Sequence, residues 1–144
     1  MSPIRRTKHA VYDVKYHIVW IPKYRKKILT GEIAEFTKQV FARIATEYEW
    51  EIEEISIQED HVHLFIHVAP KHSPASVVQI MKSISAREIF EKYPHLRKQL
   101  WAGEFWGPGY FVRSVGDQVT ADIIRKHIRY QDAEQDWSQP TLWD

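Results

Sequence analysis

The stretch Gln58-Glu59-Asp60-His61-Val62-His63-Leu64-Phe65-Ile66-His67-Val68 decides how the rest of the chain is interpreted. Its alternation predicts a β-strand, in which successive side chains point to opposite faces of a sheet. One face then carries His61, His63, Phe65 and His67, and the other carries Val62, Leu64, Ile66 and Val68. The aliphatic set is typical of a core face. Two imidazoles at positions i and i+2 fit either the polar side of a half-buried strand or two ligands of one divalent metal ion.

The segments beside this strand predict a hairpin and two helices. Residues 51–58 carry the apolar residues of a further strand, and Glu59-Asp60 predicts a tight turn between the two strands. Residues 32–48 and 77–90 carry apolar residues at the i, i+3, i+4 and i+7 spacing of amphipathic helices. The second helix should end before Pro94, because proline cannot continue a helix.

Two further strands complete the expected fold. Residues 11–21 are rich in β-branched and aromatic types and predict a strand that ends at Pro22, and residues 110–115 predict another. A final helix could begin at Thr120. The resulting order is the α+β ferredoxin-like split βαβ (βαββαβ) arrangement, with an antiparallel four-stranded sheet plus an extra C-terminal helix. Both main helices should cover one sheet face, which leaves the other face open for the histidines and for the final helix or a partner's copy of it.

Composition limits the possible classes of protein. The chain has 144 residues and is 44% hydrophobic, which suits one domain of residues 1–144 with a core of about residues 9–135 and a tail of residues 136–144. No apolar run reaches the length of a membrane span and no signal peptide is apparent, so we expect a cytoplasmic protein without a membrane partner. Because the chain has no cysteine, any metal ligands must be histidine, carboxylate or amide groups.

Charge is segregated along the chain although the net charge is only +1. Basic residues gather at residues 5–9, 23–27 and 125–129, and acidic residues concentrate between Glu47 and Asp60. This distribution suits a polyanion bound to one surface, although a charged stretch can also be a merely solvated face. The cations that we expect to contact a nucleic acid backbone are Lys23, Arg25, Lys82, Arg87, Arg113 and Arg125.

Several motifs in order along the chain resemble the single-tyrosine HUH transposases of the smallest insertion sequences, which include relatives of the REP-associated tyrosine transposases. The matching residues are Lys15-Tyr16-His17-Ile18-Val19-Trp20-Ile21-Pro22-Lys23-Tyr24-Arg25, Asp60-His61-Val62-His63-Leu64, Phe105-Trp106, Gly109-Tyr110-Phe111-Val112 and Arg125-Lys126-His127-Ile128-Arg129-Tyr130-Gln131. The resemblance runs over nearly the whole chain, so it is more specific than the histidine pair alone.

The resemblance implies a DNA transposase that cleaves and rejoins single-stranded DNA at hairpin-bearing ends. It also implies a homodimer, associated with the nucleoid of a prokaryote. His61 and His63 would bind Mg²⁺ or Mn²⁺, and Gln131 matches the third ligand of the family. The metal would stabilise charge on the scissile phosphate while a tyrosine hydroxyl attacks, leaving a 5′-phosphotyrosine link and a free 3′-OH.

One position departs from the family pattern. The family places its tyrosine four residues before the glutamine, and this chain has His127 there. Three interpretations stay open: an inactive variant or domesticated relative that binds only metal and hairpin DNA, a takeover of the nucleophile's role by Tyr130, or a role for His127 itself as a ligand or nucleophile. On a helix, Tyr130 lies about 60° around from position 127 and about 100° from Gln131, so a takeover requires an altered helix.

Other aromatic and histidine residues have ordinary explanations. We expect His17 to be packed or hydrogen-bonded, His67 to be a face or dimer-contact residue, and Trp106 either to pack in the core or to stack on bases. An RNA-binding domain of the same element order is disfavoured, because it predicts aromatic residues on the open face, where Phe65 is flanked by histidines.

Overall fold

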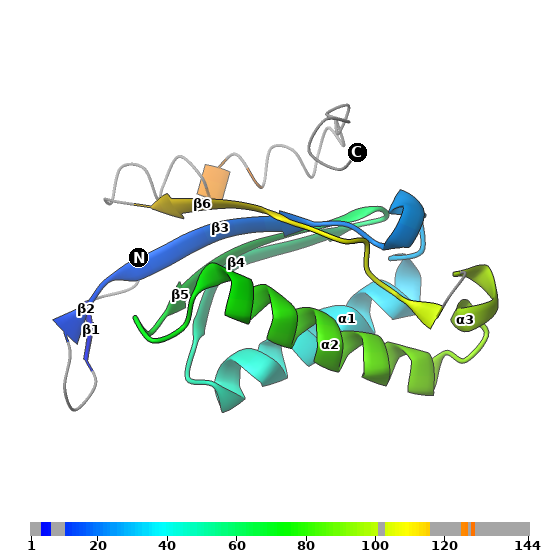
Figure 1. Cartoon of the computed structure of the whole chain (residues 1–144), viewed down its shortest axis with the longest axis horizontal. Helices are drawn as coiled ribbons and strands as arrows, with labels where there is room; N and C mark the ends of the chain where they lie inside the picture. Colours follow the sequence, from blue (N-terminus) through cyan, green and yellow to red (C-terminus); the bar gives the residue numbers. More distant parts are fainter. Residues whose placement is uncertain (1–3, 7–10, 101–102, 116–124, 127, 129–144) are drawn as a thin grey trace.

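The computed structural model describes residues 4–6, 11–100, 103–115, 125, 126 and 128 (Figure 1). Its main sheet is antiparallel and has the strand order β4-β5-β3-β6, formed by β3 (Val14–Trp20), β4 (Glu51–Gln58), β5 (His61–Val68) and β6 (Phe111–Val115). Helices α1 (Gly31–Glu47) and α2 (Pro74–Lys92) both cover one face of this sheet. The predicted α+β ferredoxin-like fold is therefore confirmed.

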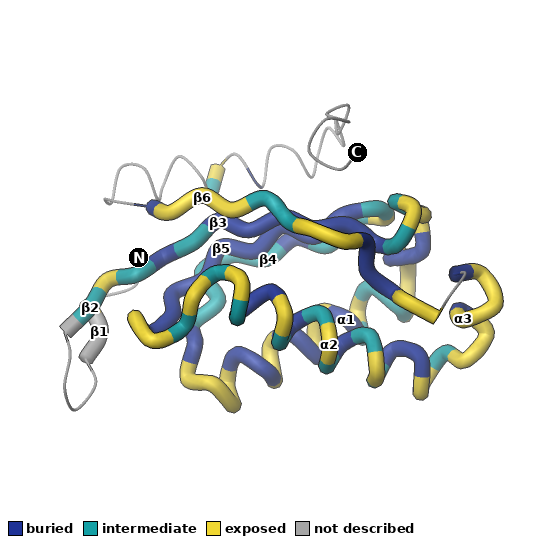
Figure 2. Tube along the Cα trace, viewed as in Figure 1, coloured by how far each residue is buried: buried dark blue, intermediate teal, exposed yellow. Residues whose placement is uncertain are grey.

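Strand β5 has the two faces that its alternation predicts. Val62, Leu64, Ile66 and Val68 belong to the main core between the sheet and the helices. On the opposite face, Phe65 forms a smaller buried cluster with Val115 and Ile128. All residues of β5 are buried, and the strand is dark blue along its length in Figure 2. The second face of β5 is therefore covered as well, and Ile128, from the segment of the predicted final helix, forms part of that cover, in agreement with the expected docking of that helix.

A β-bulge in β4 explains the uneven spacing of its isoleucines. The β4–β5 hairpin closes at the predicted turn Glu59-Asp60, but the cross-strand pairing skips Glu53. Ile52 and Ile55 are three positions apart, and strict alternation would place them on opposite faces. The extra residue in the bulge lets both pack against the same core.

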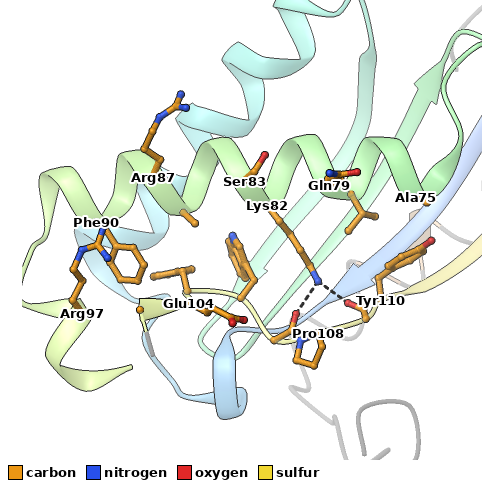
Figure 3. Close-up of a pocket in the computed structure, with 17 residues that line it drawn as sticks. Ala75, Gln79, Lys82, Ser83, Arg87, Phe90, Arg97, Glu104, Pro108 and Tyr110 are labelled. Carbon is orange, nitrogen blue, oxygen red and sulfur yellow. Dashed lines mark hydrogen bonds between the residues drawn. The ribbon is translucent and has the colours of Figure 1, made fainter. Parts of the chain in front are cut away.

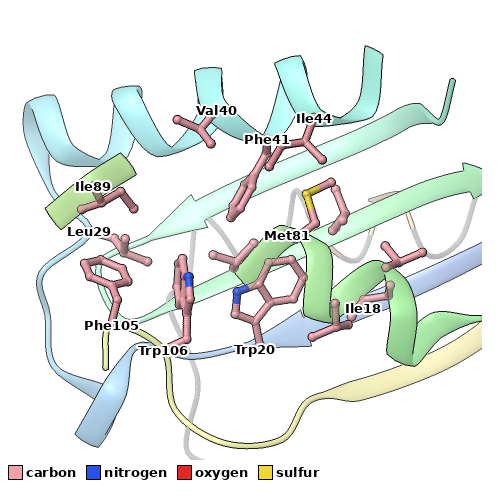
Figure 4. Packing of buried hydrophobic residues seen from close by; sticks show 14 of the residues in the cluster. Ile18, Trp20, Leu29, Val40, Phe41, Ile44, Met81, Ile89, Phe105 and Trp106 are labelled. Atoms are coloured by element: carbon pink, nitrogen blue, oxygen red, sulfur yellow. The ribbon is translucent and has the colours of Figure 1, made fainter. Parts of the chain in front are cut away.

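Aromatic packing at the centre of the core ties the segment before β6 to α1 and β3. The Trp20 ring lies edge-on to Phe41 and to Trp106, with ring centres 5.6 Å and 6.0 Å apart (Figure 4). The indole Nε1 of Trp106 donates a hydrogen bond to Oγ of Ser85 on α2, at 2.9 Å. Trp106 is therefore packed in the core, which is one of its two expected roles. Burying a side chain of this size contributes on the order of 3 kcal/mol.

Local signals fix the ends of the two main helices. Helix α1 begins at Gly31, whose φ of +51° lies in the left-handed region that glycine tolerates. Helix α2 begins with Pro74, and the side chain of the preceding Ser73 accepts a hydrogen bond from the backbone N–H of Ser76 at 3.1 Å. Helix α2 ends two residues before Pro94, as predicted.

The chain also contains short elements that its sequence pattern does not predict. The expected first strand divides into β2 (Val11–Tyr12) and β3, and β2 pairs with β1 (Arg5–Arg6) in a separate two-stranded sheet. A 3₁₀ turn, η1 (Lys23–Arg25), follows β3, and the short helix α3 (Leu96–Gln99) follows α2. These elements lengthen the connections around the sheet without changing its strand order.

The predicted final helix is described only in part. Arg125, Lys126 and Ile128 have helical backbone, and the rest of that segment lies outside the described residues. The predicted extents of the domain core and tail therefore stay predictions. Within the described ranges, no helix combines the length and the apolar character that crossing a membrane requires.

Candidate functional site

His61 and His63 lie side by side on the sheet face that points away from the two main helices. Their ring centres are 5.1 Å apart, and each residue is only 1% exposed. Strand geometry causes this proximity, because residues two apart on one strand project from the same face. The structure thus brings together the two histidines that the sequence singles out as metal ligands.

Asp60 orients the first of these rings. Nδ1 of His61 lies 2.8 Å from Oδ1 of Asp60, and the second carboxylate oxygen of Asp60 lies 3.2 Å from Nε of Arg25. The hydrogen bond from His61 lowers the pKa of Asp60, and the positive charge of Arg25 lowers it further, so this carboxyl is ionised at neutral pH. An ionised carboxylate accepts a hydrogen bond from Nδ1–H, so in the neutral ring Nε2 is the nitrogen with a lone pair.

His17 holds the second ring. Nε2 of His17, on the neighbouring strand β3, lies 3.2 Å from Nδ1 of His63. The two rings are nearly parallel, with an interplanar angle of 14° and centres 5.4 Å apart. His17 is therefore a packed, hydrogen-bonded residue as expected. In the tautomer in which Nδ1–H of His63 donates to His17, Nε2 of His63 is the nitrogen with a lone pair.

The donor set fits a divalent metal ion. With metal–nitrogen bonds of about 2.1 Å, two imidazoles bonded to one ion have ring centres about 5 Å apart, which agrees with the 5.1 Å between His61 and His63. Neutral imidazole nitrogen suits Mn²⁺ better than Mg²⁺, which prefers oxygen ligands. Asp60 and His17 supply the outer hydrogen bonds that metal-binding histidines usually have.

A second group of possible ligands lies at the other end of β5. One ligand atom each from Glu51, Glu53 and His67 lies within 4.8 Å of the others, so these residues could also hold a metal ion. A cation from the protein already lies here, since a guanidinium nitrogen of Arg125 is 3.6 Å from Oε2 of Glu53. Glu51 and Glu53 were not identified from the sequence as possible metal ligands. The uneven spacing of Ile52 and Ile55 in β4 could have indicated the bulge at Glu53.

The chain's own last segment packs against the histidine face. The guanidinium carbon of Arg125 lies 5.4 Å from the centre of the Phe65 ring, and Ile128 is fully buried in the cluster with Phe65 and Val115. The predicted residues His127, Tyr130 and Gln131 lie outside the described residues. Their roles as nucleophile and third ligand remain predictions.

The six cations predicted to contact DNA do not form one surface. Lys82 and Arg87 lie on α2, on the helical side of the sheet. Arg113 lies on β6 opposite His17, and Arg25 contacts Asp60, so both lie near the histidine pair. The remaining two, Lys23 and Arg125, form ion pairs with Glu104 and Glu53. The tertiary structure thus divides these cations between two sides of the molecule.

Solved structures with this fold define the class of protein. A crystal structure from Deinococcus radiodurans R1 that is assigned as a transposase matches with a TM-score of 0.72 and 33% identity, covering 89% of this chain and 98% of that chain. The REP-associated tyrosine transposase bound to a REP hairpin shares the fold, with a TM-score of 0.58 and 16% identity, covering 96% of this chain and 77% of that chain. The fold is thus one found in DNA transposases.

Sequence comparisons narrow this class to one family. The family model described as "Transposase IS200 like" matches residues 10–131. The ISDra2 transposase TnpA of Deinococcus radiodurans is 34% identical over 128 residues, which are 89% of this chain and 91% of that protein. The transposase for insertion sequence element IS200 of Salmonella typhimurium is 29% identical over 131 residues, which are 91% of this chain and 85% of that protein. The chain belongs to the IS200-like transposase family, which confirms the resemblance and assigns it to DNA transposition.

Proposed function

We propose that this IS200-like transposase acts on single-stranded DNA that carries hairpins near the ends of its element, with Mg²⁺ or Mn²⁺ bound by His61, His63 and Gln131. The observation that carries the proposal is the orientation of the histidine pair. Nδ1 of His61 lies 2.8 Å from Asp60 and Nδ1 of His63 lies 3.2 Å from His17, so Nε2 is the atom of each ring that we assign to the ion. The donor set favours Mn²⁺ of the two metals.

The proposed reaction is strand cleavage by a tyrosine. When bound, the ion supplies positive charge beside the scissile phosphate. His61 and His63 hold that charge in place, and Tyr130 provides the attacking hydroxyl. A bond forms between the tyrosine oxygen and phosphorus, the bond from phosphorus to the 3′ oxygen breaks, the tyrosine proton is lost, and the departing oxygen takes up a proton. The products are a 5′-phosphotyrosine link and a free 3′-OH, and reversal of the same steps rejoins strands.

A second candidate function is binding without cleavage. The observation that favours it is His127, because this residue occupies the position of the family's tyrosine. In that case the chain keeps the metal pair and the hairpin-binding surface but lacks a nucleophile. A third possibility gives His127 a direct role as a ligand or as a nucleophile that forms a phosphoramidate.

A gel assay separates these functions. An end-labelled single-stranded oligonucleotide, with a hairpin taken from the DNA flanking the coding sequence, is incubated with the protein and Mn²⁺ and run on a denaturing gel. Cleavage by Tyr130 predicts a covalent protein–DNA adduct that Tyr130→Phe abolishes and that the matched variant Tyr48→Phe keeps. An adduct that survives Tyr130→Phe but not His127→Ala supports the histidine as nucleophile instead.

The binding-only function predicts a different result in the same assay. The hairpin oligonucleotide is then shifted on a native gel but no adduct forms on the denaturing gel. Restoring the family residue with His127→Tyr should create an adduct, and adding His61→Ala should remove it again. If neither binding nor an adduct is seen with any flanking hairpin, both functions are contradicted.

We also propose that the transposase is a homodimer. Strands β4 and β6 form the two edges of the sheet and offer backbone groups for pairing between subunits. Light scattering during gel filtration should give twice the 17.2 kDa mass of one chain. A monomer mass at concentrations of about 10 μM and above would contradict a stable dimer.

A further inference from the structure

A groove of about 630 Å³ lies between α2 and residues 103–110, on the helical side of the sheet and away from the histidine pair (Figure 3). Its volume is that of an ordinary small-molecule site. Its walls are mainly apolar, and the aromatic side chains that line it are Phe90, Phe105, Trp106 and Tyr110. None of these features takes part in the function proposed above.

The wall opposite α2 is held rigidly in place. The backbone N–H of Gly107 donates to the carbonyl of Ile21 at 2.9 Å, and the N–H of Lys23 donates to the carbonyl of Phe105 at 2.8 Å. A Cβ at Gly107 would lie 3.3 Å from both the Ile21 side chain and the Pro22 carbonyl, so this close approach favours glycine. The groove is therefore formed before any ligand arrives, which reduces the ordering cost of binding.

One end of the groove offers a cation above an aromatic ring. The guanidinium carbon of Arg97 lies 4.4 Å from the centre of the Phe90 ring. Phe90 itself is 4% exposed and forms part of the floor, whereas Arg97 is exposed and can be displaced or can stack on a second ring. A planar guanidinium next to apolar walls suits a flat heteroaromatic ligand.

The other end of the groove carries the ammonium of Lys82. Its Nζ donates to the carbonyls of Gly107 and Gly109, each at 2.8 Å, and an ammonium has a third proton to donate (Figure 3). Burial lowers the pKa of Lys82 to about 8, so the side chain is still mostly protonated at pH 7. Figure 3 shows Arg87 directed away from this space.

The charge of the groove favours an anion. Apart from Arg87, which points away, the charged residues that line the groove are the cations Lys82 and Arg97 and the carboxylate Glu104. That carboxylate is partly neutralised from outside the groove by Lys23, whose Nζ lies 3.4 Å from Oε2. The net positive charge in a partly apolar groove complements a ligand with one aromatic ring system and one phosphate.

We propose that this groove binds one nucleotide, with its base on the apolar floor beside Arg97 and its phosphate on Lys82. Two sources share this chemistry: a free mononucleotide, and an unpaired nucleotide of the single-stranded DNA substrate. The second source rests on the proposed function, and it would give the helical side of the molecule a contact with DNA that is separate from the metal pair. Base stacking and the charge-assisted hydrogen bond to phosphate would each contribute to affinity.

The test measures binding of two probes in EDTA, so that the metal site does not contribute. The probes are fluorescein-labelled dT8, followed by anisotropy, and unlabelled dTMP, followed by saturation-transfer NMR and by competition with dT8. The variants are Arg97→Gln, Lys82→Gln and the groove-filling Ala86→Phe, with Lys98→Gln as the matched control. Lys98 neighbours Arg97 on α3 but does not line the groove.

The inference predicts that Arg97→Gln and Lys82→Gln each weaken dT8 binding about tenfold, whereas Lys98→Gln changes it less than about twofold. Competition by dTMP, lost in the same variants, identifies the mononucleotide as a ligand. Loss of dT8 affinity without any dTMP signal identifies the DNA nucleotide alone. Wild-type protein that binds neither probe, or equal affinities in all variants, overturns the inference. Arg97 is exposed, so its variant remains informative even if Lys82→Gln or Ala86→Phe fails to fold.

Failure of nucleotide binding in the groove can be distinguished from failure of the proposed cleavage of hairpin DNA. Adduct formation with a hairpin substrate depends on Mn²⁺ and on the last segment, and it is read on a denaturing gel. Mn²⁺ binding by His61 and His63 should be unchanged in Arg97→Gln, because the groove and the histidine pair lie on opposite sides of the sheet. Normal Mn²⁺ binding with no nucleotide binding therefore rejects the groove alone.

Discussion

Nδ1 of His61 lies 2.8 Å from Oδ1 of Asp60, the residue that immediately precedes it in the turn of the β4–β5 hairpin. A two-residue turn thus places a carboxylate directly behind the ring of the residue that begins β5. This arrangement is the carboxylate–histidine pairing found behind many metal sites. It makes the turn part of the candidate metal centre as well as part of the fold.

Asp60→Ala should weaken Mn²⁺ binding about 10- to 100-fold, because the His61 ring loses the carboxylate that orients it and raises its basicity. Isothermal titration calorimetry with MnCl₂ measures the change. Glu59→Ala, at the exposed neighbouring position of the same turn, is the matched control and should bind as the wild type does. Equal affinities for both variants would show that Asp60 has no part in the metal centre.

The ion pair between Arg125 and Glu53 should stabilise the contact of the last segment with the sheet. The two side chains are only 15% and 9% exposed, so removing one partner leaves a poorly solvated charge. Arg125→Gln and Glu53→Gln should each lower the free energy of unfolding by about 1–3 kcal/mol, and the double variant should lose clearly less than the sum. Urea denaturation of all four proteins measures this coupling.

The Arg43–Glu47 pair is the control for this comparison of single and double variants. Its nitrogen–oxygen distance is also 3.6 Å, but the side chains are 49% and 57% exposed. Its coupling should therefore stay below about 0.5 kcal/mol, as for other exposed helical pairs. Equal coupling in the two pairs would argue that burial does not strengthen the contact at Arg125.

Ser85→Ala should destabilise the protein by about 1–3 kcal/mol, because the buried indole N–H of Trp106 loses its acceptor. Ser83→Ala, two residues earlier on the exposed side of α2, should change the unfolding free energy by less than about 0.5 kcal/mol. Chemical denaturation compares the two. A smaller loss at Ser85 than at Ser83 would contradict the role of this hydrogen bond.

Lys82 should make stability depend on pH in the alkaline range. Burial lowers its pKa from 10.5 to about 8, so between these values the unfolded chain binds more protons than the folded one. The unfolding free energy should therefore rise as the pH increases from about 8 to about 10.5. Because Lys82 is partly exposed, the rise attributable to it should be about 1–2 kcal/mol.

Urea denaturation of wild type and Lys82→Met between pH 7 and pH 10.5 checks this. The difference between the two proteins removes the contribution of other titrating groups. The wild type should gain stability relative to the variant as the pH rises. A constant difference across the range would show that burial does not disfavour the charged form of Lys82.

The fold could be predicted because its signals are local. Alternation in β5, the apolar spacing of α1 and α2, and the residues that begin and end the helices each depend on neighbours a few positions apart. Together they indicated the order of elements, and only one common arrangement has that order with two helices on one face. The short elements β1 and α3 escaped prediction because two to four residues carry too little periodic signal.

The candidate site was only partly visible in the sequence. The pair His61 and His63 could be found because strand spacing alone puts both rings on one face. His17 could be given no particular partner, since its contact with His63 depends on the pairing of two strands that are 46 residues apart along the chain. The division of the predicted DNA-contacting cations between two surfaces likewise depends on how distant segments pack.

By itself, the sequence determined the element order, the two faces of β5, the histidine pair and the family of the chain, because these follow from spacing between near neighbours and from motifs. Only the tertiary structure decided which groups hold the histidine rings, that Glu53 forms a bulge facing Arg125, and that α2 and residues 103–110 enclose a groove. The physical reason is that strand register and packing between remote segments are set by the whole core at once.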